Sequence, residues 1–157
     1  MKFTFFWDGP FSQWHESPMV IDSKEYNCCE QYMMYRKASL FGDTVSVNKI
    51  MLTDYPWEQK HLGRLVRPFD DSIWMEIAED VVYEGNYAKF TQNEYLLQYL
   101  LDSEGTTIVE ASPYDLRWGI GLSEEKAKVT DPDKWPGQNL LGKVLTKLRD
   151  NILNKVE

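Results

Sequence analysis

The sequence is poor in the residues that build metal centres and covalent cross-links. It has only two cysteines, Cys28 and Cys29, and two histidines, His15 and His61. Adjacent cysteines seldom reach disulfide geometry, and neither histidine has a cysteine or carboxylate at zinc-binding spacing. We therefore expect no disulfide framework and no metal site, and two thiols of this kind are typical of a reducing compartment.

Two widespread catalytic patterns are also missing. No serine occupies a GxSxG elbow, and no glycine-rich phosphate loop is present. These absences exclude the serine-triad hydrolases that use that elbow and the phosphate-loop nucleotide triphosphatases. We expect no cofactor.

Long apolar runs and positive charge are scarce as well. The chain nowhere offers the ~18 consecutive apolar residues of a membrane helix, nor a signal-peptide core, so we expect a soluble, cytoplasmic protein with no membrane partner. Lysine and arginine number 17 against 25 acidic residues, a net charge of −8. This charge disfavours broad nucleic-acid binding, although a local basic pocket for one small anion, or a short contact with a modified base, is compatible with it.

The residues that are present suit one globular domain. Hydrophobic residues make up 43% of the 157 residues and aromatic residues 14%, which is enough for a core. No internal repeat or flexible linker interrupts the chain, so we expect a single compact domain over residues 1–157. Six tryptophans and nine tyrosines supply ring surfaces for packing or for stacking on planar ligands.

Hydrophobic periodicity predicts a mainly α fold with a few short β-strands. Asn27 is the expected N-cap of the first helix. Extended segments are expected over residues 2–7, 17–27 and 106–111, and helices over residues 27–40, 45–52, 57–65, 73–84, 88–103 and 139–153.

Glu30 is a candidate acid or base. It lies one turn inside the first expected helix, beside the apolar residues Tyr26, Cys29 and Met33, where a carboxylate is unusual. The alternative is a capping box, in which Glu30 reaches back to the N–H of Asn27 three residues earlier. The pattern alone leaves both interpretations open.

Lys60 and Arg64 are candidate phosphate ligands. They are four residues apart, so on a helix they share one face and can approach a phosphate from two directions. Two basic residues on a helix are more often a solvated face, and that alternative stays open.

The segment EASPYDLRWGIG, residues 110–121, combines two carboxylates, a tryptophan and glycines directly after an apolar run. Glu110 ends the expected strand, and Asp115 follows on a loop where a side chain can face a cleft. Trp118 and Gly119 offer an indole beside a backbone that a ligand can approach closely. The alternatives are a turn-forming carboxylate and a packed tryptophan.

Taken in order, these and other motifs resemble the YbiA-like family, also called NADAR, over nearly the whole chain. The motifs are FSQW at 11–14, EYNCCEQYMMYRKASLFGD at 25–43, KHLGR at 60–64, Trp74, AKFTQN at 88–93, IVEASPYDLRWGIG at 108–121 and WPGQNLLGKVLTKLR at 135–149.

The resemblance implies a compact, mainly helical fold and an enzyme that hydrolyses N-glycosidic bonds of ribosyl compounds. The founding bacterial member is known as a riboflavin-intermediate N-glycosidase, and other members are linked to NAD or ADP-ribose metabolism. The implied partner is a small ribosyl phosphate or an ADP-ribosyl substrate, including ADP-ribosylated guanine in DNA.

The resemblance also assigns roles. Glu30 and Asp115 become the catalytic pair, since the hydrolysis of a ribosyl C–N bond builds positive charge that carboxylates stabilise. The implied substrate-binding residues are Lys60 and Arg64 for phosphate, Trp118 and Gly119 for base or ribose, Glu110 for ribose hydroxyls or for orienting the lysine, and Asn139.

Three positions depart from the family pattern. Ala78 stands where many relatives have a basic residue, Val82 where a methionine is usual, and Thr146 where we expect simple repacking in place of methionine. The loss of a cation at Ala78 leaves room for an alternative function, a non-catalytic module that binds ADP-ribose or another NAD derivative. A helical interaction protein with neither property is the third hypothesis.

Overall fold

The computed structural model describes residues 2–155, and its internal contacts divide the chain into two compact units. We call Gln13–Glu94 the central unit, and we call Met1–Ser12 together with Tyr95–Glu157 the terminal unit. Each unit is described by itself. The single domain expected over residues 1–157 stays a prediction.

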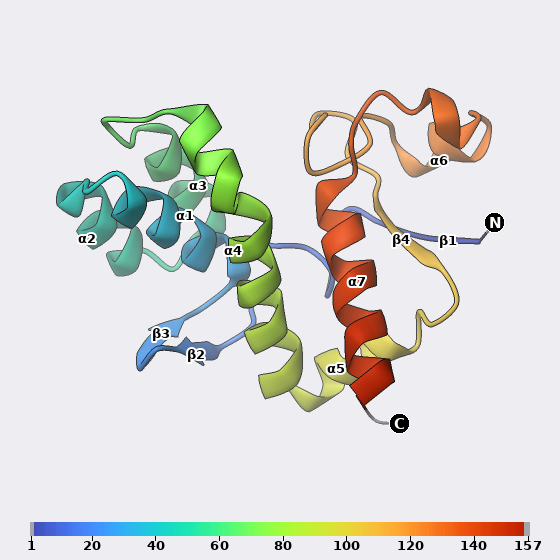
Figure 1. The fold of residues 1–157 in the computed structure, drawn as a ribbon, viewed down its shortest axis with the longest axis horizontal. Helices are drawn as coiled ribbons and strands as arrows, with labels where there is room; N and C mark the ends of the chain where they lie inside the picture. Colours follow the sequence, from blue (N-terminus) through green and yellow to red (C-terminus); the bar gives the residue numbers. More distant parts are fainter. Residues whose placement is uncertain (1, 156–157) are drawn as a thin grey trace. The chain divides into compact units, whose positions relative to one another are not determined.

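The central unit is a set of helices with one hairpin (Figure 1). Helix α1 packs against the other three helices of the unit, so its residues form much of the interior. The elements are β2 (Met19–Ile21), β3 (Lys24–Tyr26), α1 (Cys29–Leu40), α2 (Thr44–Leu52), α3 (Pro56–Arg64) and α4 (Asp71–Gln92).

The segment 17–27 is a hairpin rather than one extended piece. Strands β2 and β3 pair antiparallel, with Ile21 opposite Lys24. Asp22 and Ser23 between them have φ of 50° and 67°, the left-handed values that a two-residue hairpin turn requires. Aspartate tolerates this region better than most residues, which explains why the polar turn closes here without glycine.

The predicted N-cap of α1 is wrong. Cys28 occupies the N-cap position in extended conformation, with no hydrogen bond from its side chain to the helix end. Asn27 lies one residue earlier, and its N–H donates to Gln31 Oε1 at 2.9 Å. The glutamine therefore makes the reach-back contact that the capping-box alternative gave to Glu30.

The prediction of one helix over residues 88–103 is also wrong. Residues 73–84 and 88–92 belong to the same helix α4, whose N-cap Asp70 accepts from the N–H groups of Ser72 and Ile73. The break falls at Asn93, which is extended and whose amide donates to the carbonyl of Lys89 at 2.9 Å. This side-chain bond satisfies a carbonyl at the helix end, so α5 (Glu94–Leu101) starts separately.

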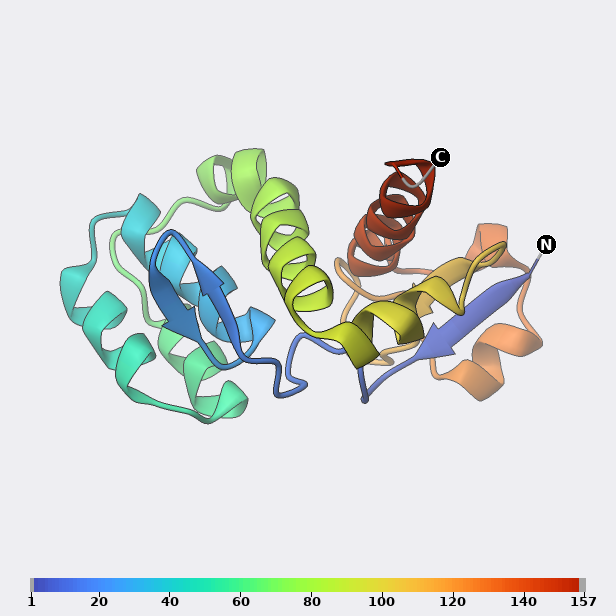
Figure 2. The same cartoon turned by 90° about the horizontal axis from the view of Figure 1, so that it is seen from below.

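The terminal unit is built around a parallel strand pair (Figure 2). Strand β1 (Phe3–Phe6) pairs with β4 (Thr107–Glu110), with Phe3 opposite Thr107 and Phe6 opposite Glu110. Helix α7 (Leu140–Lys155) packs on β4. The short helix α6 (Glu124–Lys128) and the 3-10 turn Pro132–Lys134 were not predicted, because neither is long enough to show helical periodicity.

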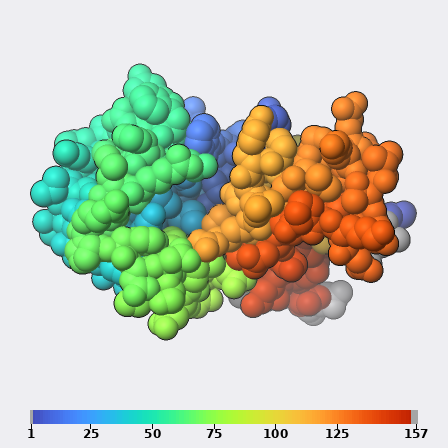
Figure 3. All heavy atoms as spheres, turned by 90° about the horizontal axis from the view of Figure 1, so that it is seen from above, coloured from blue at the N-terminus to red at the C-terminus, as the bar shows by residue number. Residues whose placement is uncertain are grey.

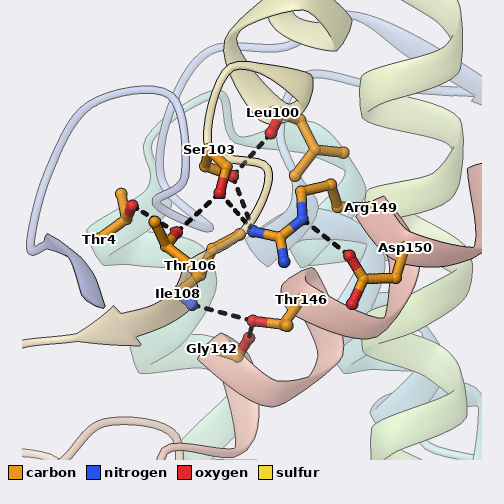
Figure 4. Close-up of polar contacts among 9 residues, drawn as sticks. All are labelled: Thr4, Leu100, Ser103, Thr106, Ile108, Gly142, Thr146, Arg149 and Asp150. Carbon is orange, nitrogen blue, oxygen red and sulfur yellow. Dashed lines mark hydrogen bonds and ion pairs between the residues drawn. The ribbon is translucent and has the colours of Figure 1, made fainter. Parts of the chain in front are cut away.

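Helix α7 is attached to the rest of the terminal unit by two polar side chains (Figure 4). Arg149 is buried, and its Nη1 donates to the carbonyl and hydroxyl oxygens of Ser103 at 2.8 and 3.1 Å. Thr146 Oγ1 accepts from the N–H of Ile108 and donates to the carbonyl of Gly142. Thr146 is thus not simple repacking, since its hydroxyl joins β4 to α7.

The observed architecture confirms the predicted fold class, mainly α with a few short β-strands. The helices at 44–52, 56–64 and 140–155 begin and end close to their expected limits. Within residues 2–155, no helix is long and apolar enough to cross a membrane.

Candidate active site

Glu30 is a buried carboxylate in the first turn of α1. The residue is only 6% exposed, and its backbone N–H donates to the carbonyl of Gln13 at 3.0 Å, which fixes the start of the helix. Its charge acts on Lys37, two turns further along α1, where it favours the protonated amine. The carboxylate therefore lies within electrostatic range of a cation in the central unit.

Lys89 is a second buried ionisable group of the central unit, and it was not predicted as a site residue. The side chain lies on α4 with 0% exposure, and burial lowers the pKa of its amine. Burial raises the pKa of the neighbouring Cys29 thiol to about 11, an effect that Lys89 opposes and Glu30 reinforces. Because both charges act on one thiol, the amine and the carboxylate lie in the same part of the unit.

Two amides, those of Asn86 and Gln13, belong to the same part of the unit through hydrogen bonds that include Cys29. Asn86 is fully buried on α4, and its Nδ2 donates to Gln13 Oε1 at 2.9 Å. The thiol of Cys29 donates to Asn86 Oδ1 at 3.6 Å. We call Gln13, Cys29, Glu30, Asn86 and Lys89 the buried polar cluster. A buried carboxylate and an amine with a lowered pKa are the kinds of group that act as acids, bases or nucleophiles.

Basic residues near the cluster form a second feature of the central unit. Burial lowers the pKa of the Lys37 amine, and repulsion from Arg64 and Arg67 lowers it further, while Glu30 and Asp71 oppose the change. Arg64 and Arg67 are exposed, and Lys37 is half-buried with its Nζ 4.5 Å from the ring centre of Phe69. We call Lys37, Arg64 and Arg67 the basic cluster.

The predicted phosphate ligands lie on α3, where their spacing of four places them on one face. Lys60 is half-buried, with its Nζ 5.9 Å from the ring centre of Trp14. Arg64 is exposed in the last turn, and it belongs to the basic cluster. Sequence reasoning missed Lys37 and Arg67, which lie outside α3. Ala78, at the position where many relatives have a basic residue, is fully buried in α4, and its methyl group has no charge to offer a phosphate.

In the terminal unit, Asp115 forms a turn. Its Oδ1 accepts from the N–H groups of Arg117 and Trp118 at 2.9 and 2.8 Å. One oxygen of the Asp115 carboxylate therefore stabilises the turn, as the turn-forming alternative predicted. A catalytic role for Asp115 stays a prediction. Figure 3 shows the loop around residues 112–118 on the surface of this unit.

Gly119 allows predicted site residues of the terminal unit to meet. A Cβ at this position would lie 2.8 Å from Glu110 Oε2 and 3.1 Å from the carbonyl oxygen of Asp115. Any side chain here would push the Glu110 carboxylate or the loop backbone away. The glycine thus serves close packing between the end of β4 and the turn that Asp115 makes.

Asn139 is buried, and its side chain bonds to backbone. Its Oδ1 accepts from the N–H of Glu110 at 2.9 Å, and its Nδ2 donates to the carbonyl of Ile108 at 3.1 Å. Its φ of 55° places it in the left-handed region just before α7. In this structure the amide holds β4 to the start of α7, and contact with a substrate stays a prediction.

The predicted site residues are shared between the units. Glu30, Lys60 and Arg64 belong to the central unit, and Glu110, Asp115, Trp118, Gly119 and Asn139 belong to the terminal unit. Residues 2–155 contain no group of three or more histidine, cysteine, aspartate or glutamate side chains placed to hold a metal ion.

The roles proposed for Asp115 are separable by substitution. Asp115→Asn keeps an oxygen that accepts from both N–H groups, so we expect the melting temperature to stay within about 2 °C and base release to fall at least tenfold if the carboxylate is catalytic. Asp115→Ala removes the acceptor, and we expect this variant to lower both the melting temperature and the rate of base release. Asn activity equal to wild type would restrict Asp115 to the turn.

Comparison with known proteins identifies the class. The chain is 51% identical over 145 residues to N-glycosidase R617 of Acanthamoeba polyphaga mimivirus, covering 89% of this chain and 85% of that protein. It is 34% identical to the chloroplastic riboflavin biosynthesis protein PYRR of Zea mays, covering 96% of this chain but 25% of PYRR. N-glycosidase YbiA of Escherichia coli K12 is 27% identical over 145 residues, covering 92% of this chain and 81% of that protein.

A solved structure agrees with these relatives. The NMR structure of the E. coli protein YbiA matches 99% of this chain and 88% of its own with a TM-score of 0.80 at 25% identity. With relatives named as N-glycosidases, the chain is a hydrolase of N-glycosyl bonds. Residues 5–153 match the model of the NADAR domain, and the chain belongs to this family, as its motifs indicated.

Proposed function

We propose that the protein hydrolyses the C–N glycosidic bond of a phosphorylated ribosyl compound. The substrate class comprises riboflavin-pathway intermediates and ADP-ribosyl adducts, including ADP-ribosylated guanine in DNA. The observation that supports it most is the burial of the Glu30 carboxylate, 6% exposed, on α1, the helix that also carries Lys37 of the basic cluster.

A phosphate group suits the basic cluster. Burial is the main cause of the lowered pKa of the Lys37 amine, and repulsion from Arg64 and Arg67 lowers it further against the opposing effect of Glu30 and Asp71. A phosphate dianion bound at the basic cluster would relieve the repulsion among these charges, and the two arginines can offer paired N–H donors to the phosphate oxygens. Lys60, on the same helix as Arg64, is a further phosphate ligand in this proposal.

The buried polar cluster suits the bond cleavage. As the C–N bond breaks, the anomeric carbon gains positive charge and the base leaves with the bond electrons. A water oxygen then bonds to that carbon, and its proton passes to a carboxylate or amine while the base acquires one. In this proposal Glu30 stabilises the positive charge or accepts the proton, and Lys89 is a second group that can accept or donate a proton. Asp115 remains a catalytic candidate because of the family resemblance of its motif.

The names of relatives support small substrates of the riboflavin pathway. PYRR is named for riboflavin biosynthesis, and the chain matches about a quarter of its length. A net charge of −8 disfavours long-range attraction of DNA, which favours the small phosphorylated substrate over the DNA adduct. A binding module without catalysis is disfavoured by the relatives named as N-glycosidases.

The proposal is tested by incubating the protein with an aminouracil ribosyl phosphate, NAD, ADP-ribose and ADP-ribosylated DNA and detecting the released base by mass spectrometry. We expect release from a phosphorylated ribosyl substrate, at least tenfold faster than from its dephosphorylated form, because the phosphate is held by the basic cluster. Equal rates with and without the phosphate would contradict the proposed substrate class. Binding without release from any substrate would support the module.

A further inference from the structure

Two large aromatic side chains of the terminal unit contact each other and remain exposed. Trp7 is 58% exposed and Tyr114 is 83% exposed, although their ring centres are only 6.1 Å apart, with an interplanar angle of 51°. Exposed rings of this size leave apolar surface in water, which is unfavourable unless a ligand covers it. Their contact with each other does not bury them.

The strand pair places these two rings together. Strand β1 ends at Phe6 and β4 ends at Glu110, opposite each other in a parallel ladder. The N–H of Ala111 donates to the carbonyl of Phe6 at 2.7 Å, so the two segments leave the sheet side by side. In parallel sheets, ligands bind beyond the carboxyl ends of the strands, and by analogy this edge is the expected ligand position.

The loop that carries Tyr114 is held by hydrogen bonds. The N–H of Tyr114 donates to Ser112 Oγ at 3.3 Å, and Asp115 accepts from two N–H groups directly after it. The carbonyl of Leu116 accepts from the N–H of Gln138 at 2.8 Å, which ties the loop to a second segment. The backbone of such a loop loses little further conformational freedom when a ligand binds, so the cost of ordering is confined to the side chain.

The acidic residues that follow Trp7 and Tyr114 in the sequence indicate which chemical group of a ligand would bind at the rings. Asp8 follows Trp7 and Asp115 follows Tyr114 in the sequence, so an acidic residue comes directly after each ring-bearing residue. Carboxylates repel phosphate, but they accept hydrogen bonds from the amino groups of a heterocyclic base. Ring faces with neighbouring acceptors therefore match an amino-bearing base.

We infer that Trp7 and Tyr114 form a stacking site of the terminal unit for the planar, amino-bearing base of a nucleotide ligand. This inference rests on the proposed function and makes the two rings determinants of specificity for the base. Stacking on aromatic side chains strengthens with ring area, so bicyclic bases bind more tightly here than monocyclic ones.

The test is calorimetric titration with guanosine 5′-monophosphate, cytidine 5′-monophosphate and ribose 5-phosphate. The wild-type protein is expected to bind them in that order of decreasing affinity. Trp7→Ala and Tyr114→Ala are each expected to weaken binding of the guanine nucleotide about tenfold and to change binding of ribose 5-phosphate less than twofold. Tyr95→Ala, which removes a 63% exposed ring from α5, is the matched control and is expected to change neither.

Three results would overturn the inference: wild-type affinity that does not depend on the base, equal weakening of the guanine nucleotide and ribose 5-phosphate, or an effect of Tyr95→Ala as large as that of Tyr114→Ala. Base release is measured separately. If the protein discriminates between bases but releases none, the proposed function is refuted and the stacking site is supported. If it releases base but does not discriminate between bases, the proposed function is supported and the stacking site is refuted.

Discussion

Replacement of Glu30 by glutamine is expected to lower the rate of base release at least a hundredfold and to leave the fold intact. Glutamine keeps the size of the side chain but cannot accept a proton or carry negative charge, and general acid–base groups contribute about 10²–10⁴-fold. The backbone bond from Glu30 to Gln13 does not involve the side chain, so the start of α1 is kept. The measurement is kcat by chromatography of the released base, beside a thermal melt.

Glu25→Gln is the matched control for this substitution. Glu25 lies on β3 in the same unit and is exposed, so the same chemical change at this position should leave kcat within twofold of wild type. A Glu30→Gln variant that melts normally and turns over within threefold of wild type would remove Glu30 from the mechanism. A rise in KM with unchanged kcat would assign Glu30 to substrate binding instead.

Lys89→Met is expected to abolish most activity, again by at least a hundredfold. Methionine fills nearly the same volume but has no amine, and buried lysines with a lowered pKa are suited to act as bases or nucleophiles. In the wild type, the basic form of Lys89 accumulates below the ordinary lysine pKa of 10.5, because burial disfavours the charged amine. The kcat of the wild type should therefore increase with pH at values below 10.5, and the residual kcat of the variant should show no such increase.

The stability of Lys89→Met gives an independent readout. The pKa of Lys89 is lower in the folded state than in the unfolded state. Below the folded-state pKa the buried amine is charged, and the whole cost of burying that charge lowers the stability of the fold. The cost decreases as pH rises and is gone above the unfolded-state pKa. The variant should therefore melt higher than wild type at neutral pH, with a gain that vanishes near pH 10.5. Exposed Lys49→Met on α2 is the control. A variant with wild-type kcat at every pH would contradict a catalytic role.

The sequence predicted most helices because their apolar periodicity is a local property. It failed at Asn93, where a single side-chain amide, bonded to the carbonyl of Lys89, separates two segments that are both apolar enough to continue. It failed at the start of α1 for a similar reason. Gln31 bonds to the Asn27 N–H while its Nε2 donates to the carbonyls of Ile50 and Thr53, and these contacts with the end of α2 are not visible in the local sequence.

The site was predictable only in part. Motif order pointed to Glu30, Lys60 and Arg64, and the helices expected to carry them are present as α1 and α3, while their roles stay predictions. Lys89 was missed because burial of a lysine cannot be inferred from its own type, although its position between Ala88 and Phe90 was the available signal. Lys37 was missed because its relation to Arg64 depends on how α1 and α3 pack.

The pairing of β1 with β4 has a consequence for synthesis on the ribosome. Phe3 emerges early, but its partner Thr107 emerges only after the whole central unit has been translated. At a translation rate of ~5–20 residues per second, the FTFFW segment waits on the order of ten seconds with its backbone unpaired and its rings in water. During that interval the nascent chain presents an aromatic segment of the kind that chaperones bind, whereas the central unit already has all its residues.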